Sequence, residues 1–278
     1  MVNYLTQNTG VFILSQFLYT NGMYLSVIIP AYKEQKHIKN TIESIYSYLT
    51  SKNIEHEIIV VTDGLGDNTK SIVDSMISSG LFPTLKHLDL PLNRGKGFAV
   101  RRAMLKAGGD YRLFTDADNA TSIDHIERMI PFFNQGYDVI IGSIAVPGYT
   151  VASGSEPYWR RLFGKMGNLF IQIVAVPGIH DTQRGFKIVN AKTAQDIFSR
   201  MTIDRWGFDI EMLALARKLD YKIKEVPVDW KNDPDTDSHP KFSAYFQVLM
   251  ETVKIRLNLI TGKYNKPINE MVEGEILH

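Results

Sequence analysis

Two apolar runs separated by a helical segment constrain the fold of this 278-residue chain more than any other feature. Residues 25–30 (LSVIIP) and 57–62 (EIIVVT) are nearly uninterrupted apolar stretches, as expected of strands that are buried on both faces. Between them, apolar residues recur at helical spacing from Ile38 to Leu49. A strand, a helix and a second strand in this order favour a parallel pair. The chain therefore predicts a sheet that is covered by helices.

The same alternation continues through the first half of the chain. The pattern predicts helices over 67–79, 96–107 and 122–134, and strands over 85–90, 111–115 and 137–141. This is the pattern of a doubly wound α/β fold, a mostly parallel sheet with helices on both faces. Ligands of such folds bind at the carboxyl ends of the strands.

The second half of the chain has a different pattern. Residues 147–157 are rich in Gly, Pro, Ser and Tyr and predict a loop, a candidate lid. Residues 158–176 are basic at the start and almost wholly apolar at the end, and beyond them the pattern predicts helices over 208–219 and 242–261 and a strand over 222–228. The apolar stretch 169–176 fits either core packing or a lipid-facing role. The last helix is amphipathic and carries Lys254 and Arg256, with Lys263 after it, so it is either a surface helix or an anchor on a membrane surface.

Composition excludes several classes of protein. The chain has 31 Lys and Arg against 30 Asp and Glu, so no global positive field favours a nucleic acid as the partner. It has no cysteine, which excludes disulfides, thiolate catalysis and cysteine-ligated zinc and fits a cytoplasmic location. The apolar segment 11–19 is shorter than the roughly 20 residues that span a bilayer. We expect any membrane contact to be peripheral, on the cytoplasmic face.

These patterns divide the chain into three parts. We expect an N-terminal apolar helix or extension over 1–23, a catalytic α/β domain over 24–231, and an acidic loop, amphipathic helix and tail over 232–278.

Two carboxylates follow the strand predicted at 111–115. In the stretch LFTDADN, Asp116 and Asp118 stand where the backbone turns, so both can converge on one hard cation that bridges a nucleotide diphosphate. Taken alone, the same residues also fit the start of the next helix, because Asp, Asn, Ser and Thr favour N-caps. The rest of the chain favours the cation site.

Several motifs occur in an order that resembles the family 2 glycosyltransferases, nucleotide-sugar enzymes with the Rossmann-like GT-A fold. They are SVIIPAYKE (26–34), VTDGLGDNT (61–69), NRGKGFAVRRA (93–103), DADNAT (116–121), DTQRGFK (181–187) and WGFDIEML (206–213). The chain looks most similar to the dolichyl- and polyprenyl-phosphate β-glucosyltransferases and mannosyltransferases of that family. The resemblance implies a GT-A fold, here followed by the C-terminal amphipathic helix.

The resemblance also implies the residues that bind the donor. Asp116 and Asp118 would hold Mg2+ or Mn2+, and Asp63 would accept the N–H of the base. Donor contacts are expected from Pro30, Ala31, Tyr32, Glu34, Asp63, Lys96, Asp116 and Ala117. The chain departs from the family pattern at Thr62 and Leu65, where an acid and a serine are usual.

An acceptor phosphate is expected to meet basic side chains, which the resemblance assigns to Arg160, Arg161, Arg184 and Lys187. The catalytic set is expected to be Asp116, Asp118, Asp209, Arg184 and Arg160. Ile144 stands where many relatives have an arginine that helps to hold the phosphate. Arg160, Arg161 or Arg184 would have to supply that positive charge instead. A phosphate acceptor is already an anion and needs no base, whereas a hydroxyl acceptor would need Asp209 or Glu211 as the base.

The sequence thus predicts an inverting, metal-dependent glycosyltransferase that moves a hexose to a polyprenyl or dolichyl phosphate, forming a β-linked lipid-phospho-sugar. UDP-glucose is the expected donor and GDP-mannose the alternative. Two other hypotheses stay open: transfer to a glycan or small-molecule hydroxyl, and an inactive nucleotide-binding or membrane-adaptor protein.

Overall fold

The computed structural model of the chain describes residues 23–148, 158–231 and 242–268, and only the backbone of residues 158–165 and 242. The predicted N-terminal apolar segment, most of the candidate lid, the acidic loop and the C-terminal tail lie outside the described residues.

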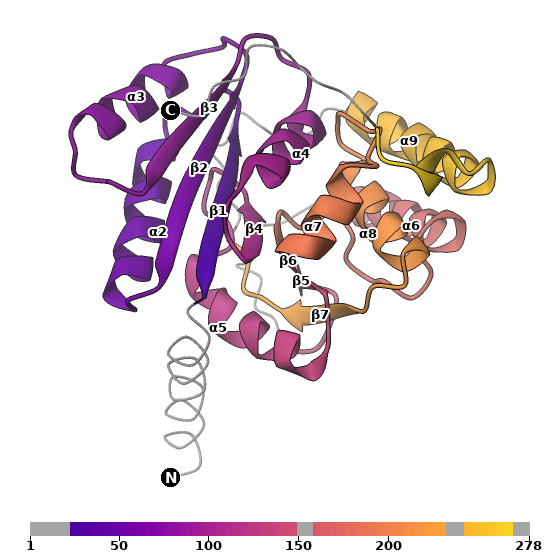
Figure 1. The fold of residues 1–278 in the computed structure, drawn as a ribbon. Coiled ribbons are helices and arrows are strands. Elements are labelled where there is room, and N and C mark those ends of the chain that lie inside the picture. The colour runs from indigo at the N-terminus through magenta and orange to yellow at the C-terminus, as the bar shows by residue number, and fades with distance from the viewer. Residues whose placement is uncertain (1–22, 149–157, 232–241, 269–278) are drawn as a thin grey trace.

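A seven-stranded sheet forms the centre of the fold, with the strand order β3-β2-β1-β4-β6-β5-β7 (Figure 1). β6 is antiparallel to both β4 and β5, and the other pairings are parallel. This confirms the expected mostly parallel sheet. The strands are β1 (Tyr24–Ala31), β2 (Glu55–Asp63), β3 (Leu85–Leu90), β4 (Tyr111–Thr115), β5 (Val139–Ser143), β6 (Phe186–Asn190) and β7 (Ile223–Pro227).

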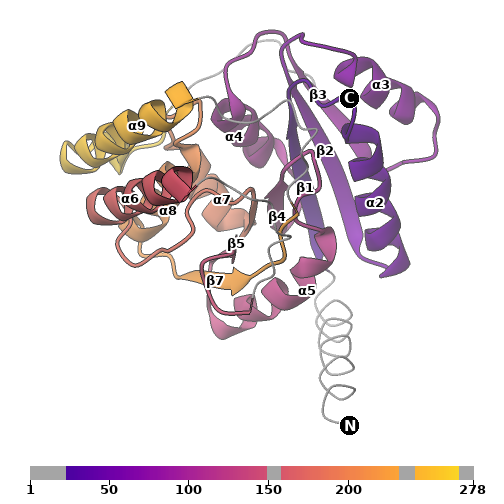
Figure 2. The same cartoon turned by 180° about the vertical axis from the view of Figure 1, so that it is seen from behind.

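Helices cover both faces of the sheet and enclose one apolar core on each side (Figures 1 and 2). α2 (Ile38–Ser51), α3 (Thr69–Ser78) and α5 (Ile126–Met129) cover one face. α4 (Lys96–Lys106), α7 (Ala191–Phe198) and α8 (Phe208–Lys218) cover the other, and α6 (Tyr158–Val174) and α9 (Phe242–Ile260) pack outside α8. Short 3-10 turns are η1 (Ile123–His125), η2 (Ile130–Gln135) and η3 (Lys263–Asn265).

Two expectations about local structure are corrected. The helix predicted over 122–134 is broken into η1, α5 and η2, because Pro131 at the start of η2 has no backbone N–H to continue the α-helical bonds. β6 and α7 were not predicted. Asn190 ends β6 and caps α7, since its side chain accepts a hydrogen bond from the backbone N–H of Thr193 at 2.8 Å.

The strand order reverses between β1 and β4, which creates a topological switch point. β2 and β3 follow β1 outward on one side, while β4 lies on its other side. At such a point the connections leave in opposite directions, so a crevice forms at the carboxyl ends of the strands. Ala31 ends β1, Asp63 ends β2, and Asp116 directly follows β4. The predicted donor residues therefore gather at one edge of the sheet.

The two outer helices lie side by side. α9 contributes Val248 and Ile255 to the core, and α6 contributes Ile171. In the stretch 169–176, Ile171, Ala175 and Val176 are buried while Leu169 and Ile173 are exposed, so core packing accounts for only part of it. No helix within the described ranges is both long and apolar enough to cross a membrane.

Glu57 in β2 links three elements and makes the stability of the fold depend on pH. Its buried carboxylate accepts hydrogen bonds from Ser26 Oγ at 2.5 Å, Lys86 Nζ at 2.7 Å and the backbone N–H of Gly108 at 2.7 Å. Burial acts to raise the pKa of Glu57, but these hydrogen bonds outweigh it and hold the pKa below its ordinary value.

We expect Glu57→Gln to destabilise the protein at pH 7 by about 2 kcal/mol, the size of a lost hydrogen-bonding set to a charged group. Because the folded state binds its proton less readily than the unfolded state, Glu57 stabilises the fold above the ordinary glutamate pKa. This stabilisation is lost as the pH falls through the folded pKa. The difference between variant and wild type should therefore shrink as the pH falls below the ordinary glutamate pKa of about 4.3 and vanish only once the folded carboxylate is protonated. Urea denaturation at several pH values measures it, with Glu55→Gln at the exposed start of β2 as the control.

Candidate active site

Asp116 and Asp118 stand at the end of β4, beside a lysine from α4. The Lys96 ammonium forms an ion pair with Asp116 Oδ1. Asp118 Oδ1 accepts a hydrogen bond from the backbone N–H of Ala120 at 3.0 Å, which turns the chain after the second carboxylate. Asn119, between Asp118 and Ala120, adopts a left-handed conformation, with φ at 54°. The turn therefore holds two carboxylates and one cation together at the switch point.

The two carboxylates fit a divalent cation. Burial, and then the charge of Asp116, raise the pKa of the Asp118 carboxyl, so a bound cation would favour its ionised form. Burial lowers the pKa of Lys96, but Asp116 and Asp209 outweigh it and the pKa lies above its ordinary value. Within the described ranges, no group of three or more His, Asp or Glu could hold a metal. Mg2+ or Mn2+ bound here would complete its shell with water and substrate oxygens, as Mg2+ commonly does.

Gly185 brings the motif DTQRGFK against the carboxylate pair. A Cβ added at Gly185 would lie 2.1 Å from Asp116 Oδ2 and 2.3 Å from Asp116 Cγ. The Asp116 carboxylate thus packs directly on the Gly185 backbone, and the neighbouring Arg184 comes from the same turn. Glycine is required here because any side chain would displace Asp116.

We expect Gly185→Ala to lower activity by at least about tenfold, because the new methyl group displaces Asp116 from the site. The measurement is the steady-state transfer rate together with a melting curve that checks folding. Gly108→Ala is the matched control, since a Cβ there meets Tyr24 Cε1 and Glu57 Oε1 at 3.5 and 3.6 Å, ordinary contact distances. Equal activity of Gly185→Ala and wild type would show that the position of Asp116 does not matter.

Asp63 supports the turn that begins α4. Its Oδ1 accepts a hydrogen bond from the backbone N–H of Arg94, and its Oδ2 accepts one from Gly95, both at 2.8 Å. Gly95 has φ at 114°, and a Cβ there would lie 2.5 Å from the Asp204 carbonyl oxygen. Asp63 therefore positions Lys96 by fixing the residues before it. The contact to a base that the sequence predicts for Asp63 stays a prediction.

Asp204 holds one arginine of this turn, Arg94, and one of α4, Arg101. Arg94 Nη2 lies 3.5 Å from Asp204 Oδ2, and Arg101 Nη2 lies 3.3 Å from Asp204 Oδ1. Arg94 also stacks on Phe98, with 3.7 Å between the guanidinium carbon and the ring centroid. Arg101 is buried, so it is a structural residue of α4 and not a solvated helix charge. Asp204 had no local sequence signal, since it lies far along the chain.

The end of β1 and the residues after it form another part of the carboxyl edge of the sheet. Pro30 and Ala31 pair with Val61 and Thr62 of β2, and Tyr32 after them is exposed. The buried Glu34 follows Lys33, whose φ is 61°, and the Glu34 backbone N–H donates to Thr69 Oγ1 at 2.9 Å.

Ala117, between the two carboxylates, is also buried, and its carbonyl accepts from Thr41 Oγ1 at 2.6 Å. The predicted donor residues thus lie at the carboxyl edge of the sheet, on β1, β2, α4 and the turn after β4.

Thr62, one of the departures from the family pattern, belongs to a separate network. Its hydroxyl donates to Asp89 Oδ1 at 2.7 Å, and Asp89 Oδ2 accepts from Lys70 at 2.5 Å. The threonine therefore joins β2 to β3 and α3 without adding charge. Leu65, the other departure, is exposed.

Arg184 is fixed beside the end of β5. Asp181 Oδ2 accepts from Arg184 Nε at 3.2 Å and from the backbone N–H of Ile144 at 2.9 Å. The Arg184 guanidinium carbon lies 4.6 Å from the ring centroid of Trp230. Arg184 therefore lies close to the position where Ile144 lacks the arginine of many relatives. The side chains of Arg160 and Arg161 lie outside the described residues, so their predicted role stays a prediction.

Lys187 is not available to an acceptor, which corrects its predicted role. Its side chain is 0% exposed, and its Nζ lies 2.5 Å from Asp209 Oδ1. It also donates to the Arg184 carbonyl oxygen. Because Asp209 in turn acts electrostatically on Lys96, the charges from Asp116 through Lys96 and Asp209 to Lys187 alternate in sign, with Asp118 as a second negative charge beside Asp116. Lys187 and Asp209 form the buried end of this series beneath the carboxylate pair.

Glu211 faces away from the site, which excludes it as the alternative base. Its Oε1 accepts from the backbone N–H of Thr202 at 2.8 Å, from Thr202 Oγ1 at 2.7 Å and from Tyr264 Oη at 2.6 Å. Its Oε2 accepts from the backbone N–H of Ile203 at 2.8 Å. As expected for residues two apart on a helix, Asp209 and Glu211 point to different faces of α8.

Comparison with known proteins gives one family and a consistent set of relatives. The family model described as Glycosyl transferase family 2 matches residues 26–198. The chain is 35% identical over 253 residues to the dolichyl-phosphate beta-glucosyltransferase of Dictyostelium discoideum, covering 87% of this chain and 76% of that protein. It is 30% identical over 253 residues to the human dolichyl-phosphate beta-glucosyltransferase, covering 86% and 77%.

Solved structures agree on the fold. Glucosyl-3-phosphoglycerate synthase from Mycobacterium tuberculosis, crystallised with Mg2+ and UDP, superposes with a TM-score of 0.64 over 96% of this chain and 90% of that chain. The same enzyme with Mn2+, UDP-glucose and phosphoglyceric acid gives a TM-score of 0.63 over 93% and 85%. The sequence identity is 15% in both cases, so this similarity shows the GT-A fold alone.

Proposed function

This chain belongs to glycosyl transferase family 2 and is a glycosyltransferase, and from that premise we propose that it transfers glucose from UDP-glucose to a dolichyl or polyprenyl phosphate. The anomeric carbon is attacked in line by a phosphate oxygen, so the product is a β-linked lipid-phospho-glucose and UDP leaves. Relatives over most of the chain carry the name dolichyl-phosphate beta-glucosyltransferase, which supports this acceptor and sugar.

The observation that carries the proposal is the contact between the Gly185 backbone and the Asp116 carboxylate. It brings a fixed arginine, Arg184, next to a carboxylate pair suited to a metal and a diphosphate. Donor and acceptor phosphates could then meet at one edge of the sheet, with Lys96 and Arg184 on its two sides.

The donor side of the site would act mainly through charge. Asp116 and Asp118 would hold a divalent cation, which when bound would supply positive charge for the departing diphosphate. Lys96 is already held at the site by Asp116 and can donate a hydrogen bond to a diphosphate oxygen. Tyr32, Glu34 and Asp63 would line the nucleoside, at the ends of β1 and β2. Neither Lys96 nor Asp116 needs to transfer a proton during the reaction.

On the acceptor side, the arrangement favours a phosphate over a hydroxyl. An acceptor phosphate is an anion at neutral pH and needs positioning, which Arg184 can provide from its place between Asp181 and Trp230. A hydroxyl acceptor would need a base, but Asp209 is paired with Lys187 and Glu211 is enclosed by four hydrogen bonds. To reach a lipid acceptor, the enzyme would also have to act at a membrane surface, as a peripheral protein on the cytoplasmic face.

The test is nucleotide release from UDP-glucose and from GDP-mannose, with Mg2+ or Mn2+ and with or without a short polyprenyl phosphate in detergent. We expect UDP release that depends on metal and lipid and an extractable glucolipid. Release from GDP-mannose alone would overturn the donor. Slow release that does not depend on the lipid would overturn the acceptor.

A further inference from the structure

The exposed apolar side chains of this molecule are concentrated on two neighbouring helices. Of the fourteen large apolar side chains that are exposed in the described ranges, ten belong to α6 and α9. They are Met166, Leu169, Phe170 and Ile173 on α6, and Tyr245, Phe246, Met250, Val253, Leu257 and Ile260 on α9. A soluble surface rarely exposes so many apolar groups together. We call these ten residues the paired-helix surface.

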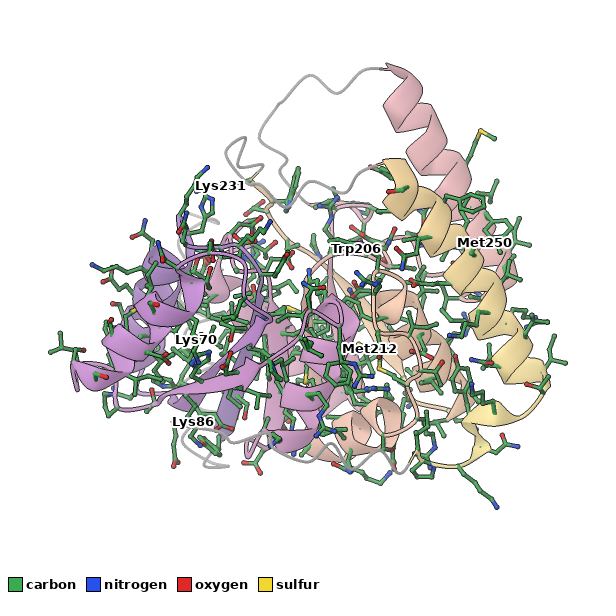
Figure 3. The ribbon with its side chains drawn as sticks, turned by 90° about the horizontal axis from the view of Figure 1, so that it is seen from above. Lys70, Lys86, Trp206, Met212, Lys231 and Met250 are labelled. Atoms are coloured by element: carbon green, nitrogen blue, oxygen red, sulfur yellow. The ribbon has the colours of Figure 1, made fainter. Side chains whose placement is uncertain are left out.

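The spacing of these residues makes a continuous stripe on each helix. On α9, positions 246, 250, 253, 257 and 260 repeat at intervals of four and three, so they share one face. On α6, positions 166, 169, 170 and 173 follow the i, i+3, i+4, i+7 pattern and also share one face. The two helices lie side by side at the edge farthest from α2 and α3, where Figure 3 labels Met250. The stripes therefore form one surface and not two separate ones.

The charges around the stripes favour an anionic partner. Lys254 and Arg256 are exposed on α9 and flank its stripe on opposite sides, and Lys263 and Lys266 are exposed just beyond it. Glu251 is the single acidic residue in the sequence of the two helices. It faces the body of the protein, where its Oε2 accepts from the backbone N–H of Gly207 at 2.6 Å. The rim of the paired-helix surface is thus basic.

We propose that the paired-helix surface docks the enzyme on a membrane that contains anionic lipids, with the apolar stripes of α6 and α9 in the interface and the basic side chains at the headgroups. Apolar stripes with Lys and Arg at their flanks are the pattern of helices that lie in a membrane interface. A second copy of the chain fits less well, because a symmetric interface would bring the same basic rims together. The proposal rests on the proposed function in one respect: the membrane would supply the lipid acceptor.

The opposite face of α9 connects this surface to the site. Glu251 binds Gly207, the residue that caps the N-terminus of α8, and Asp209 lies two residues further along. A Cβ at Gly207 would lie 2.8 Å from Glu251 Oε2, so the two segments are in direct contact. A membrane on the outer face of α9 would therefore lie one helix away from the floor of the site. This is a suitable place to receive a phosphate whose lipid tail stays in the bilayer.

The test is sedimentation of the full chain with vesicles of phosphatidylcholine, with and without phosphatidylserine. The triple variant Ile173→Gln, Phe246→Gln and Leu257→Gln should bind both kinds of vesicle about a hundredfold more weakly, because three interface side chains become polar. The variant Lys254→Gln with Arg256→Gln should lose affinity only for vesicles with phosphatidylserine. Leu81→Gln changes an exposed leucine elsewhere and should bind like wild type.

Two further measurements separate this proposal from the proposed function. Transfer to a short, water-soluble polyprenyl phosphate should be unchanged in the triple variant, whereas transfer to a long-chain acceptor in vesicles should fall with binding. Unchanged vesicle binding of the triple variant overturns the docking surface, whatever the enzyme transfers. A wild-type dimer in solution that the triple variant converts to a monomer would assign the surface to a second copy. Absence of any transfer by wild type, with binding lost in the variant, overturns the proposed function alone.

Discussion

Replacing Asp118 by Asn should lower the transfer rate by about a thousandfold, equivalent to about 4 kcal/mol in the activation barrier, while the fold is preserved. Asp116 already shares its charge with Lys96, so Asp118 is the carboxylate with the most negative charge left for a cation. Asparagine keeps an oxygen that can accept the 3.0 Å hydrogen bond from the backbone N–H of Ala120, so it can preserve the turn. The lost property is therefore charge and not shape.

Although Asp118→Asn lowers the transfer rate, it should not lower the stability of the metal-free protein. Burial and the charge of Asp116 raise the pKa of Asp118, so its ionised form is unfavourable in the folded protein. Removing that charge should leave the metal-free melting temperature equal to or above that of wild type. We expect Mn2+ to stabilise wild type by binding to the folded state, and the substitution should abolish this stabilisation. A loss of activity from misfolding would instead lower the melting temperature.

Asp124→Asn provides the matched control, because Asp124 lies in the next turn of chain and its side chain is 55% exposed. It should leave both the transfer rate and the response to Mn2+ unchanged. The measurements are UDP release as a function of metal concentration and melting curves with and without Mn2+. Full transfer activity in Asp118→Asn would show that the carboxylate pair is not the metal site.

The parts of the fold that were predicted correctly are those with a strong local signal. The bounds of β3 and β4 agree with the sequence pattern, because each is a short segment with apolar residues that is bounded by turn residues. β6 was missed because its sequence, Phe186–Asn190, contains a lysine, and lysine is rarely buried in a strand. Lys187 is tolerated there because Asp209, 22 residues further along, supplies the opposite charge. A partner at that distance leaves no local pattern.

The same limit applies to the site. The motif with Asp116 and Asp118 is local, so the sequence identifies both carboxylates. The contact of Asp116 with Gly185, its ion pair with Lys96 and the support of Lys96 by Asp63 join separate strands. Only the folded chain brings these residues together. Lys187 and Arg184 belong to the same motif, but in the folded chain Lys187 is a buried partner of Asp209 while Arg184 is partly exposed.

Removing the Lys187 ammonium should destabilise the protein strongly. Lys187→Met leaves the Asp209 carboxylate buried without its partner at 2.5 Å, and breaking a buried ion pair in this way costs about 3–5 kcal/mol. Lys96 becomes the nearest cation to Asp209, so the substitution should also draw Lys96 away from Asp116 and reduce transfer. Guanidinium denaturation measures the stability, and UDP release measures the activity.

The double variant Lys187→Met with Asp209→Leu separates the cost of an unpaired charge from the value of the pair itself. Phe114 and Phe208 line this region, with ring centroids 5.6 Å apart, so two apolar side chains there should pack acceptably. Replacing both members of a buried ion pair by apolar residues is often nearly neutral, and we expect the double variant to recover most of the lost stability. Its activity should stay low if Asp209 is needed to position Lys96. Lys192→Met, in the exposed pair between Lys192 and Asp196 on α7, is the control and should change little. A loss below about 1 kcal/mol for Lys187→Met would show that the buried pair does not stabilise the floor of the site.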